Sequence, residues 1–106
     1  MNLEIEYSPD ALAHLGALRK FDQVRIVSEI EEQLRHEPLM PSRRRKQMQS
    51  NLISTWELRI GDFHAYYDVD DVQPVVLIRA IGLKVRDRVF VGGEEVDLSD
   101  EDHRNH

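Results

Sequence analysis

The stretch from residue 56 to residue 69 constrains the fold of this chain more than any other. Hydrophobic and polar residues alternate over residues 56–60 and again over residues 63–69, and only Gly61 and Asp62 separate the two runs. Alternation on both sides of a two-residue turn that contains glycine is the signature of a tight β-hairpin. The sequence therefore predicts two antiparallel strands whose register is set by the turn.

One face of this hairpin is polar, because successive side chains of a strand point to opposite sides of the sheet. The polar face carries Glu57, Arg59, His64, Tyr66 and Asp68. Such a face is either a solvated surface or a functional site. The residues alone favour a solvated surface, because exposed cross-strand pairs contribute only a few tenths of a kcal/mol each.

The N-terminal part predicts a short strand followed by a short helix. Residues 3–7 alternate as a strand with one buried face. Ser8 can cap the helix, and Pro9 suits the first helical position, where no N–H is needed. The expected apolar stripe of this helix consists of Leu12, Leu15 and Leu18.

A second helix is predicted to follow at once. Asp22 is the expected cap, Phe21 is expected to pack against Ile26, and the helix is expected to end near His36. Its apolar face repeats through Val27, Ile30 and Leu34. Two helices joined by so few residues form an antiparallel pair, which can cover the apolar face of the sheet.

Residues 38–51 predict a loop that leads into the hairpin, because prolines interrupt the pattern and polar residues follow. The loop contains four consecutive cations, which we expect to be exposed: Arg43, Arg44, Arg45 and Lys46. A run of this kind is usually a solubilising surface. The alternative is a clamp for phosphate groups.

After the hairpin, Asp70 and Asp71 begin a turn that Pro74 ends. Residues 75–81 are β-branched and aliphatic, which is typical of a central strand covered on both faces, and Gly82 interrupts the run. The whole chain thus predicts an α+β fold in a single domain. Its elements are an N-terminal strand, an α-helical hairpin and an antiparallel meander of three to four strands.

Length and composition indicate the number of domains, the cellular compartment and the absence of a membrane span. A chain of 106 residues forms one domain, which we assign to residues 1–96, with residues 97–106 as an acidic, flexible tail. The absence of cysteine excludes disulfides and favours the reducing cytoplasm. No apolar stretch approaches the roughly 20 residues that span a bilayer, so no membrane association is expected.

Charge is unevenly distributed along the chain. The formal net charge is −6, yet residues 40–90 carry nine Lys or Arg against six Asp or Glu. The acidic residues are concentrated toward the two ends. The region of the hairpin is therefore locally basic, and it could bind phosphate groups despite the acidic total.

Four short segments resemble a known family: Trp56-Glu57-Leu58-Arg59, Gly61-Asp62-Phe63, Tyr67-Asp68-Val69 and Ala80-Ile81-Gly82-x-Lys84. With the order of the predicted elements, they are similar to the RelE/ParE superfamily of bacterial toxins from type II toxin–antitoxin systems, over residues 2–96. The RelE-like branch implies a ribosome-dependent, metal-independent mRNA endonuclease that inhibits translation and is neutralised by a cognate antitoxin. The ParE-like branch implies the same fold acting on DNA gyrase.

The resemblance also implies a set of catalytic positions. Its members are Glu57, Arg59, His64, Lys84 and Arg86. Glu57 is acidic where RelE-like nucleases are basic, and His64 stands where they have arginine. Phe90 stands where some members have a tyrosine hydroxyl, although glutamate and histidine serve as base and acid in other branches of the superfamily.

Metal-free cleavage of RNA by its own 2′-hydroxyl needs a base, an acid and cations. His64 or Glu57 is expected to transfer protons, while the cations hold the phosphate and stabilise the transition state. Tyr66 is expected to stack on a base. The predicted RNA-binding residues are Arg43, Arg44, Arg45, Lys46, Tyr66 and Arg88. The other histidines lack ligand spacing, so no metal and no cofactor are predicted.

Two classes of function remain open at this point. The first is an mRNA-cleaving toxin that acts on messages at the ribosome and has a cognate antitoxin as its partner. The second is a binding protein, which is either a ParE-like inhibitor of DNA gyrase or a non-catalytic relative that binds only its antitoxin.

Overall fold

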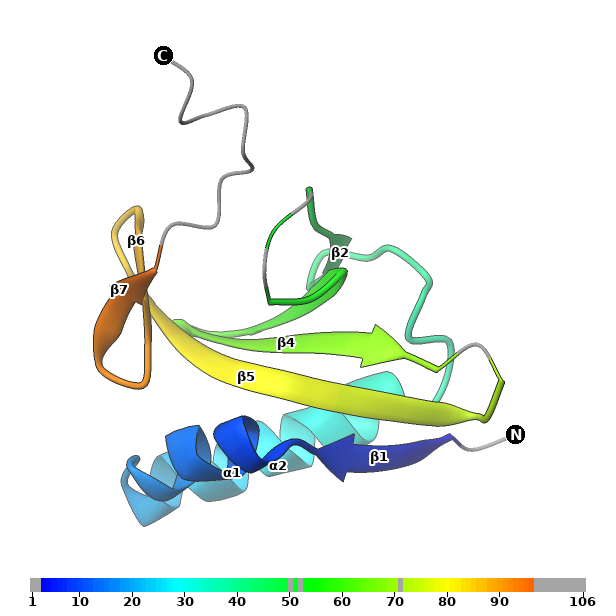
Figure 1. Cartoon of the computed structure of the whole chain (residues 1–106), viewed down its shortest axis with the longest axis horizontal. Helices are drawn as coiled ribbons and strands as arrows, with labels where there is room; N and C mark the ends of the chain where they lie inside the picture. Colours follow the sequence, from blue (N-terminus) through cyan, green and yellow to red (C-terminus); the bar gives the residue numbers. More distant parts are fainter. Residues whose placement is uncertain (1–2, 50, 52, 71, 97–106) are drawn as a thin grey trace.

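The computed structural model describes residues 3–49, 51, 53–70 and 72–96, and in these residues two helices lie along one face of a twisted sheet (Figure 1). The elements in chain order are β1 (Glu4–Tyr7), α1 (Pro9–Gly16), α2 (Lys20–Leu34), β2 (Arg45–Gln47), β3 (Trp56–Ile60), β4 (Phe63–Val69), β5 (Val75–Val85), β6 (Arg88–Val91) and β7 (Glu94–Val96). The predicted α+β class, with a strand, a helix pair and an antiparallel meander in that order, is confirmed.

The sheet is built around β5, the longest strand. Strands β2 to β7 follow one another as antiparallel neighbours, whereas β1 pairs with β5 in parallel. β1 lies beside the first part of β5, and β6 lies beside its last part, from Gly82 onward. The parallel pairing was not predicted, because nothing in the local pattern of residues 3–7 specifies a distant partner strand.

Helix α1 begins as predicted. The hydroxyl of Ser8 accepts a hydrogen bond from the backbone N–H of Ala11 at 3.1 Å, and Pro9 is the first helical residue. The predicted stripe is wrong at Leu12, which is 57% exposed, whereas Ala11 and Leu15 are buried. Helix α1 thus rests on the sheet through Ala11 and Leu15.

Helix α2 differs from the prediction at its start. It begins at Lys20 with Arg19 as its cap residue, and Asp22 lies in the first turn, 3.3 Å from the Arg19 guanidinium. An acidic residue is favourable there because it faces the positive end of the helix dipole. Phe21 is 72% exposed and does not pack against the fully buried Ile26, so the predicted staple is wrong.

The core lies between the helix pair and the apolar face of the sheet. The sheet contributes Leu58, Ile60 and Tyr67 to it. The expected apolar face of α2 is present, with Ile26, Ile30 and Leu34 completely buried and Val27 partly buried. Burial of each large aliphatic side chain contributes about 1.5–3 kcal/mol to folding.

In three segments, the strands include residues that were not predicted to be in strands. Residues 45–47, expected as loop, form β2, which pairs with β3 because the outer backbone groups of β3 need partners. β5 continues through Gly82 to Val85, and residues 94–96 form β7. Asp71, predicted in the turn, and the tail of residues 97–106 lie outside the described residues.

A β-bulge in β5 decides which side chains face the site. Tyr66 lies opposite Ala80, but Tyr67 lies opposite Ile78, so Arg79 is an extra residue in β5. Strict alternation from the core residue Ile78 would place Lys84 on the helix side of the sheet. The bulge reverses this, and Lys84 shares the polar face with His64.

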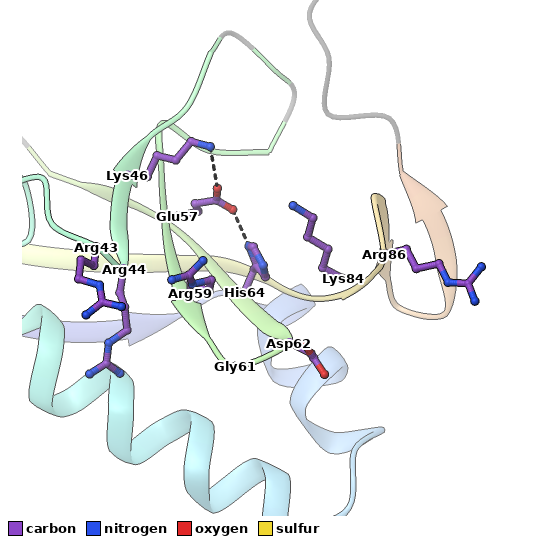
Figure 2. Close-up of a pocket in the computed structure, with 10 residues that line it drawn as sticks. All are labelled: Arg43, Arg44, Lys46, Glu57, Arg59, Gly61, Asp62, His64, Lys84 and Arg86. Atoms are coloured by element: carbon purple, nitrogen blue, oxygen red, sulfur yellow. Dashed lines mark hydrogen bonds and ion pairs between the residues drawn. The ribbon is translucent and has the colours of Figure 1, made fainter.

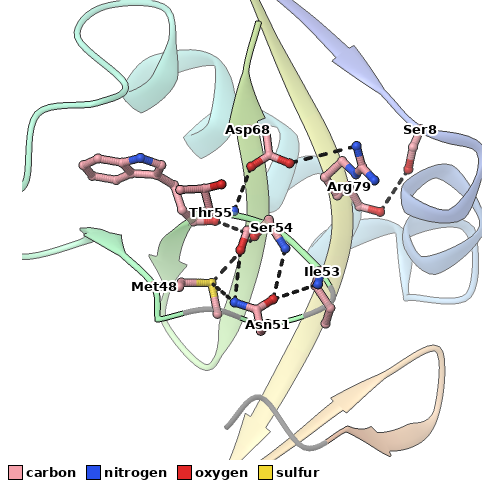
Figure 3. Close-up of polar contacts among 9 residues, drawn as sticks. Ser8, Met48, Asn51, Ile53, Ser54, Thr55, Asp68 and Arg79 are labelled. Atoms are coloured by element: carbon pink, nitrogen blue, oxygen red, sulfur yellow. Dashed lines mark hydrogen bonds and ion pairs between the residues drawn. The ribbon is translucent and has the colours of Figure 1, made fainter. Parts of the chain in front are cut away.

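The bulge is held by contacts on both sides of the strand (Figure 3). The hydroxyl of Ser8 donates a hydrogen bond to the Arg79 carbonyl at 2.9 Å, so the cap of α1 also fixes the bulge. The Arg79 guanidinium lies 4.0 Å from the Asp68 carboxylate, which in turn accepts a hydrogen bond from the Thr55 N–H at 2.7 Å. The bulge in β5 is thus connected through Asp68 to β4, the strand that carries His64.

Candidate functional site

A hollow of about 420 Å³ opens on the polar face of the β3–β4 hairpin (Figure 2). We call it the cationic hollow. It is lined by Arg43, Arg44, Lys46, Glu57, Arg59, Gly61, Asp62, His64, Lys84 and Arg86. Six of these ten residues are cationic and only Glu57 and Asp62 are acidic, so the hollow attracts anions although the whole chain is acidic.

Glu57 and His64 form a hydrogen-bonded pair at the floor of the cationic hollow. Oε2 of Glu57 lies 2.6 Å from Nδ1 of His64, and the two side chains are only 13% and 8% exposed. A carboxylate only accepts, so Nδ1 of His64 carries the hydrogen in the neutral ring, and Nε2 is left as an acceptor. Within the described part of the chain Nε2 has no hydrogen-bond partner.

The carboxylate of Glu57 is charged at neutral pH. Burial acts to raise its pKa, but the hydrogen bond and electrostatic attraction of His64, together with the positive charges of Lys46 and Lys84, outweigh burial and lower the pKa. Nζ of Lys46 lies 3.9 Å from the other oxygen of this carboxylate. The floor of the hollow therefore holds one negative charge among positively charged side chains.

The cations of the hollow differ in whether they form ion pairs with residues of the chain. The guanidinium of Arg44 lies 2.7 Å from Glu29 on α2, so it is already paired. No ion pair engages Arg43, Arg59 or Lys84 within the residues that the structure describes. These side chains are available to an incoming anion, and Arg59 lies directly opposite His64 in the sheet.

Lys84 and Arg86 come from the end of β5. The backbone N–H of Lys84 donates a hydrogen bond to the Asp62 carbonyl at 2.8 Å, which fixes the end of β5 to the hairpin turn. Arg86 lines the rim, and its guanidinium points away from His64 (Figure 2). Its backbone φ is +59°, a left-handed conformation that is rare for a residue other than glycine.

Arg45 does not belong to the site. Successive residues of β2 point to opposite faces, so Arg45 faces away from the hollow that Arg44 and Lys46 line. Its guanidinium donates hydrogen bonds to the carbonyls of Gln33 at 3.0 Å and Met40 at 2.9 Å. The prediction of four exposed cations is wrong for this one, which is half-buried.

Two further predicted RNA-binding residues lie elsewhere. Tyr66 is completely buried beside His64, so it cannot stack on an RNA base as predicted. Arg88 lies on β6 outside the cationic hollow and forms an ion pair with Glu95 at 3.4 Å. Sequence reasoning missed Asp62 and Gly61 as lining residues, although their place in the turn beside Arg59 was a signal.

Among the described residues, no three His, Asp or Glu side chains are grouped so that they could hold a metal ion. None of the helices in this part of the chain is long and apolar enough to cross a membrane. The predicted lack of a metal or cofactor stays a prediction.

The fold defines the class to which this protein belongs. The structure resembles the toxin–antitoxin complex RelBE2 from Mycobacterium tuberculosis, with a TM-score of 0.68 and 23% identity, over 79% of this chain and 93% of the other. It also resembles the archaeal RelE–RelB complex from Pyrococcus horikoshii OT3, with a TM-score of 0.61 and 19% identity, over 81% of this chain and 99% of the other. The architecture is therefore the RelE-like α+β fold.

The family follows from the sequence match. Residues 5–88 match the family described as ParE toxin of type II toxin-antitoxin system, parDE. A search of curated proteins gave no match. The chain belongs to the ParE toxin family and is a toxin of the RelE/ParE superfamily, as the resemblance predicted.

Proposed function

We propose that this toxin is a metal-independent, ribosome-dependent mRNA endonuclease that inhibits translation. The observation that carries the proposal is the pair of Glu57 and His64, buried at the floor of the cationic hollow. A buried carboxylate–imidazole pair is typical of proton transfer, whereas a surface that only binds a protein needs none. The surrounding cations are suited to a phosphate group.

Proton transfer would be carried out by His64. Nε2 of His64 takes the proton of the RNA 2′-hydroxyl, the 2′-oxygen attacks phosphorus, and the bond between phosphorus and the 5′-oxygen breaks. The leaving 5′-oxygen takes a proton from water, so the products are a 2′,3′-cyclic phosphate and a 5′-hydroxyl. Glu57 keeps His64 in the required tautomer and stabilises the imidazolium that forms.

The cations would stabilise the charge that develops on the phosphate. Arg59 lies opposite His64 in the sheet, and Lys84 reaches the same hollow from β5. Fixed donors count most where charge develops in the transition state, and loss of one such donor lowers kcat by about 10²–10³-fold. Arg43 and Arg86 at the rim would contact flanking phosphates.

The partner that we propose is a cognate antitoxin. The two similar solved structures are both complexes of a toxin with an antitoxin. A cationic hollow of this size would be covered by an acidic or extended segment of such a partner. Occupation of the hollow would exclude RNA, which accounts for neutralisation without a change in the catalytic residues.

Inhibition of DNA gyrase is the second candidate. The specific observation in its favour is the family match, because that family is described by its ParE toxin and not by RelE. Phe90 also lacks the hydroxyl that some RelE-like members carry at this place. A relative that only binds its antitoxin is the remaining alternative.

Primer extension on messages from cells that express the toxin separates these functions. We expect cuts inside translated codons with the wild-type chain, and their reduction by about 10²–10⁴-fold in His64→Gln. Arg59→Met is expected to act in the same direction. Arg88→Met is the matched control, because this cation lies outside the hollow, and it should cleave normally.

Other outcomes assign the function differently. Induction of the SOS response with intact messages would support gyrase as the target and overturn the nuclease. Normal growth of cells that express the folded wild-type chain would leave only binding to an antitoxin.

A further inference from the structure

Tyr66 lies beside His64 on the polar face of β4 but does not itself line the cationic hollow. The two residues are two positions apart on the strand, so their side chains share one face. Their ring centroids are 6.1 Å apart, and the ring planes are inclined by 27°. Although it is on the polar face, Tyr66 has no exposed surface. Its ring therefore closes one side of the space that the imidazole occupies.

Gly82 provides the room for this ring. It lies directly opposite His64 in the register of β4 and β5. A Cβ at this position would be 2.9 Å from Cε2 of Tyr66 and 3.3 Å from its hydroxyl oxygen. The backbone of Gly82 does not have positive φ, so conformation does not require glycine here. Glycine is needed here because the Tyr66 ring occupies the space that a Cβ would fill.

The hydroxyl of Tyr66 contributes little to this packing. It is buried without a hydrogen-bond partner among the described residues. Burial and then the nearby Glu57 carboxylate raise the pKa of Tyr66, so the hydroxyl stays neutral. A buried polar group without a partner is unfavourable. The ring, and not the hydroxyl, is thus the part of Tyr66 that acts on His64.

The bond with Glu57 alone does not fix His64. It holds one ring atom, Nδ1, at 2.6 Å, and the imidazole could still swing about that contact. Such a swing would carry Nε2 away from the hollow. The ring of Tyr66 restricts the movement on its side, because it is stacked beside the imidazole with an inclination of 27°.

We propose that Tyr66 is a positioning residue, which together with Gly82 keeps Nδ1 of His64 on Glu57 and Nε2 toward the cationic hollow. The consequence for catalysis rests on the proposed function. The positioning itself concerns the free protein, so it is measured without RNA.

The test is ¹⁵N NMR of the histidine side chains in the full chain at pH 8, with the His64 signals assigned by comparison with His64→Gln. In the wild type we expect one tautomer of His64, with hydrogen on Nδ1, and nuclear Overhauser effects between the two rings. Tyr66→Phe should keep both. Tyr66→Leu, and Gly82→Ala through displacement of the ring, should give a mixture of tautomers. Gly16→Ala is the control for Gly82→Ala, because a Cβ there meets nothing within 4 Å.

Two results would overturn the positioning role. One is the same tautomer in a folded Tyr66→Leu or Gly82→Ala variant as in the wild type. The other is the absence of ring-to-ring effects in the wild type, which decides the question even where a variant does not fold.

Cleavage assays with translating ribosomes then separate this role from the proposed function. Tyr66→Leu should lower kcat by about 10- to 100-fold with little change in KM, and Tyr66→Phe should be near normal. If the wild type cleaves no message, the nuclease proposal fails, while the NMR result still decides the positioning role.

Discussion

Glu57 on β3 and His64 on β4 are diagonal neighbours in the sheet and not direct partners, yet their side chains are joined by a hydrogen bond of 2.6 Å. The residue directly opposite His64 on β3 is Arg59, and the one opposite it on β5 is Gly82. The imidazole thus has a cation on one side, while on the other side the Tyr66 ring fills the space at Gly82. A phosphate held by Arg59 would lie beside a group that can transfer a proton.

The first prediction concerns the dependence of stability on pH. The pKa of Glu57 is lowered in the folded protein, so the unfolded chain binds a proton to this group more readily. Its stabilising contribution is present above the unfolded pKa near 4.3 and is lost as pH falls through the lower folded pKa. Glu57→Gln should lower the unfolding free energy at pH 7 by about 1–3 kcal/mol.

Urea denaturation between pH 3 and pH 7 checks this prediction. The difference between wild type and Glu57→Gln should shrink toward acidic pH. Asp62→Asn is the control, because this exposed acidic residue also lines the hollow and should change stability little. A difference that is constant over the whole range would contradict the assignment of a charged, stabilising Glu57.

The second prediction concerns binding of RNA to the cationic hollow. Lys84→Met should weaken binding of a short single-stranded RNA and reduce the slope of log K against log salt by about 0.7, because one phosphate contact is lost. Fluorescence anisotropy with a 2′-deoxy-substituted, uncleavable oligonucleotide measures both. Arg88→Met removes the same charge outside the hollow and should leave the slope unchanged; an equal loss in both variants would speak against a localised site.

The third prediction separates stability from binding at Arg86. Its φ of +59° is strained for any residue but glycine. Arg86→Gly should therefore raise stability by about 1 kcal/mol, or about 4–8 °C in Tm, while it weakens RNA binding. Glu37→Gly is the matched control, because Glu37 has φ of +49° but lies outside the hollow.

Calorimetry and the anisotropy assay together decide this prediction. Glu37→Gly should gain stability without loss of RNA binding. If Arg86→Gly binds RNA as well as the wild type, Arg86 has no part in substrate binding and its strained backbone has another origin.

The fourth prediction concerns the neighbouring cations Arg43 and Arg45. Arg45→Met removes the hydrogen bonds to the carbonyls of Gln33 and Met40 and should destabilise the fold by about 1–3 kcal/mol. RNA binding by the folded variant should be unchanged. Arg43→Met should show the reverse, with stability within about 0.5 kcal/mol of wild type and weaker binding. Equal effects of both variants on RNA binding would instead support the original hypothesis, in which all four cations of residues 43–46 bind phosphate groups.

The hairpin and the helices were predictable because their signals are local. Alternation around Gly61 and Asp62 specifies a pair of strands and places Glu57 and His64 on one face, as the structure confirms. The cap at Ser8 and the apolar repeat of α2 are equally local. The family resemblance in these same segments led to the superfamily, which the comparisons confirm.

The surroundings of His64 depended on contacts between distant segments. Whether Arg45 or Lys46 faces the hollow follows from the pairing of β2 with β3, and no periodic pattern marks a strand of only three residues. Tyr66 is buried because Gly82 of another strand leaves room for it.

The sequence by itself thus determined the elements, their order and the chemical groups on the hairpin, because strand and helix periods are properties of neighbouring residues. Only the tertiary structure decided which of those groups meet. The extra residue Arg79, held through Ser8 and Asp68, turns Lys84 to the side of His64. The bulge depends on how β5 pairs with β4 and on contacts from Ser8 and Asp68, so the residues on either side of Arg79 do not predict it.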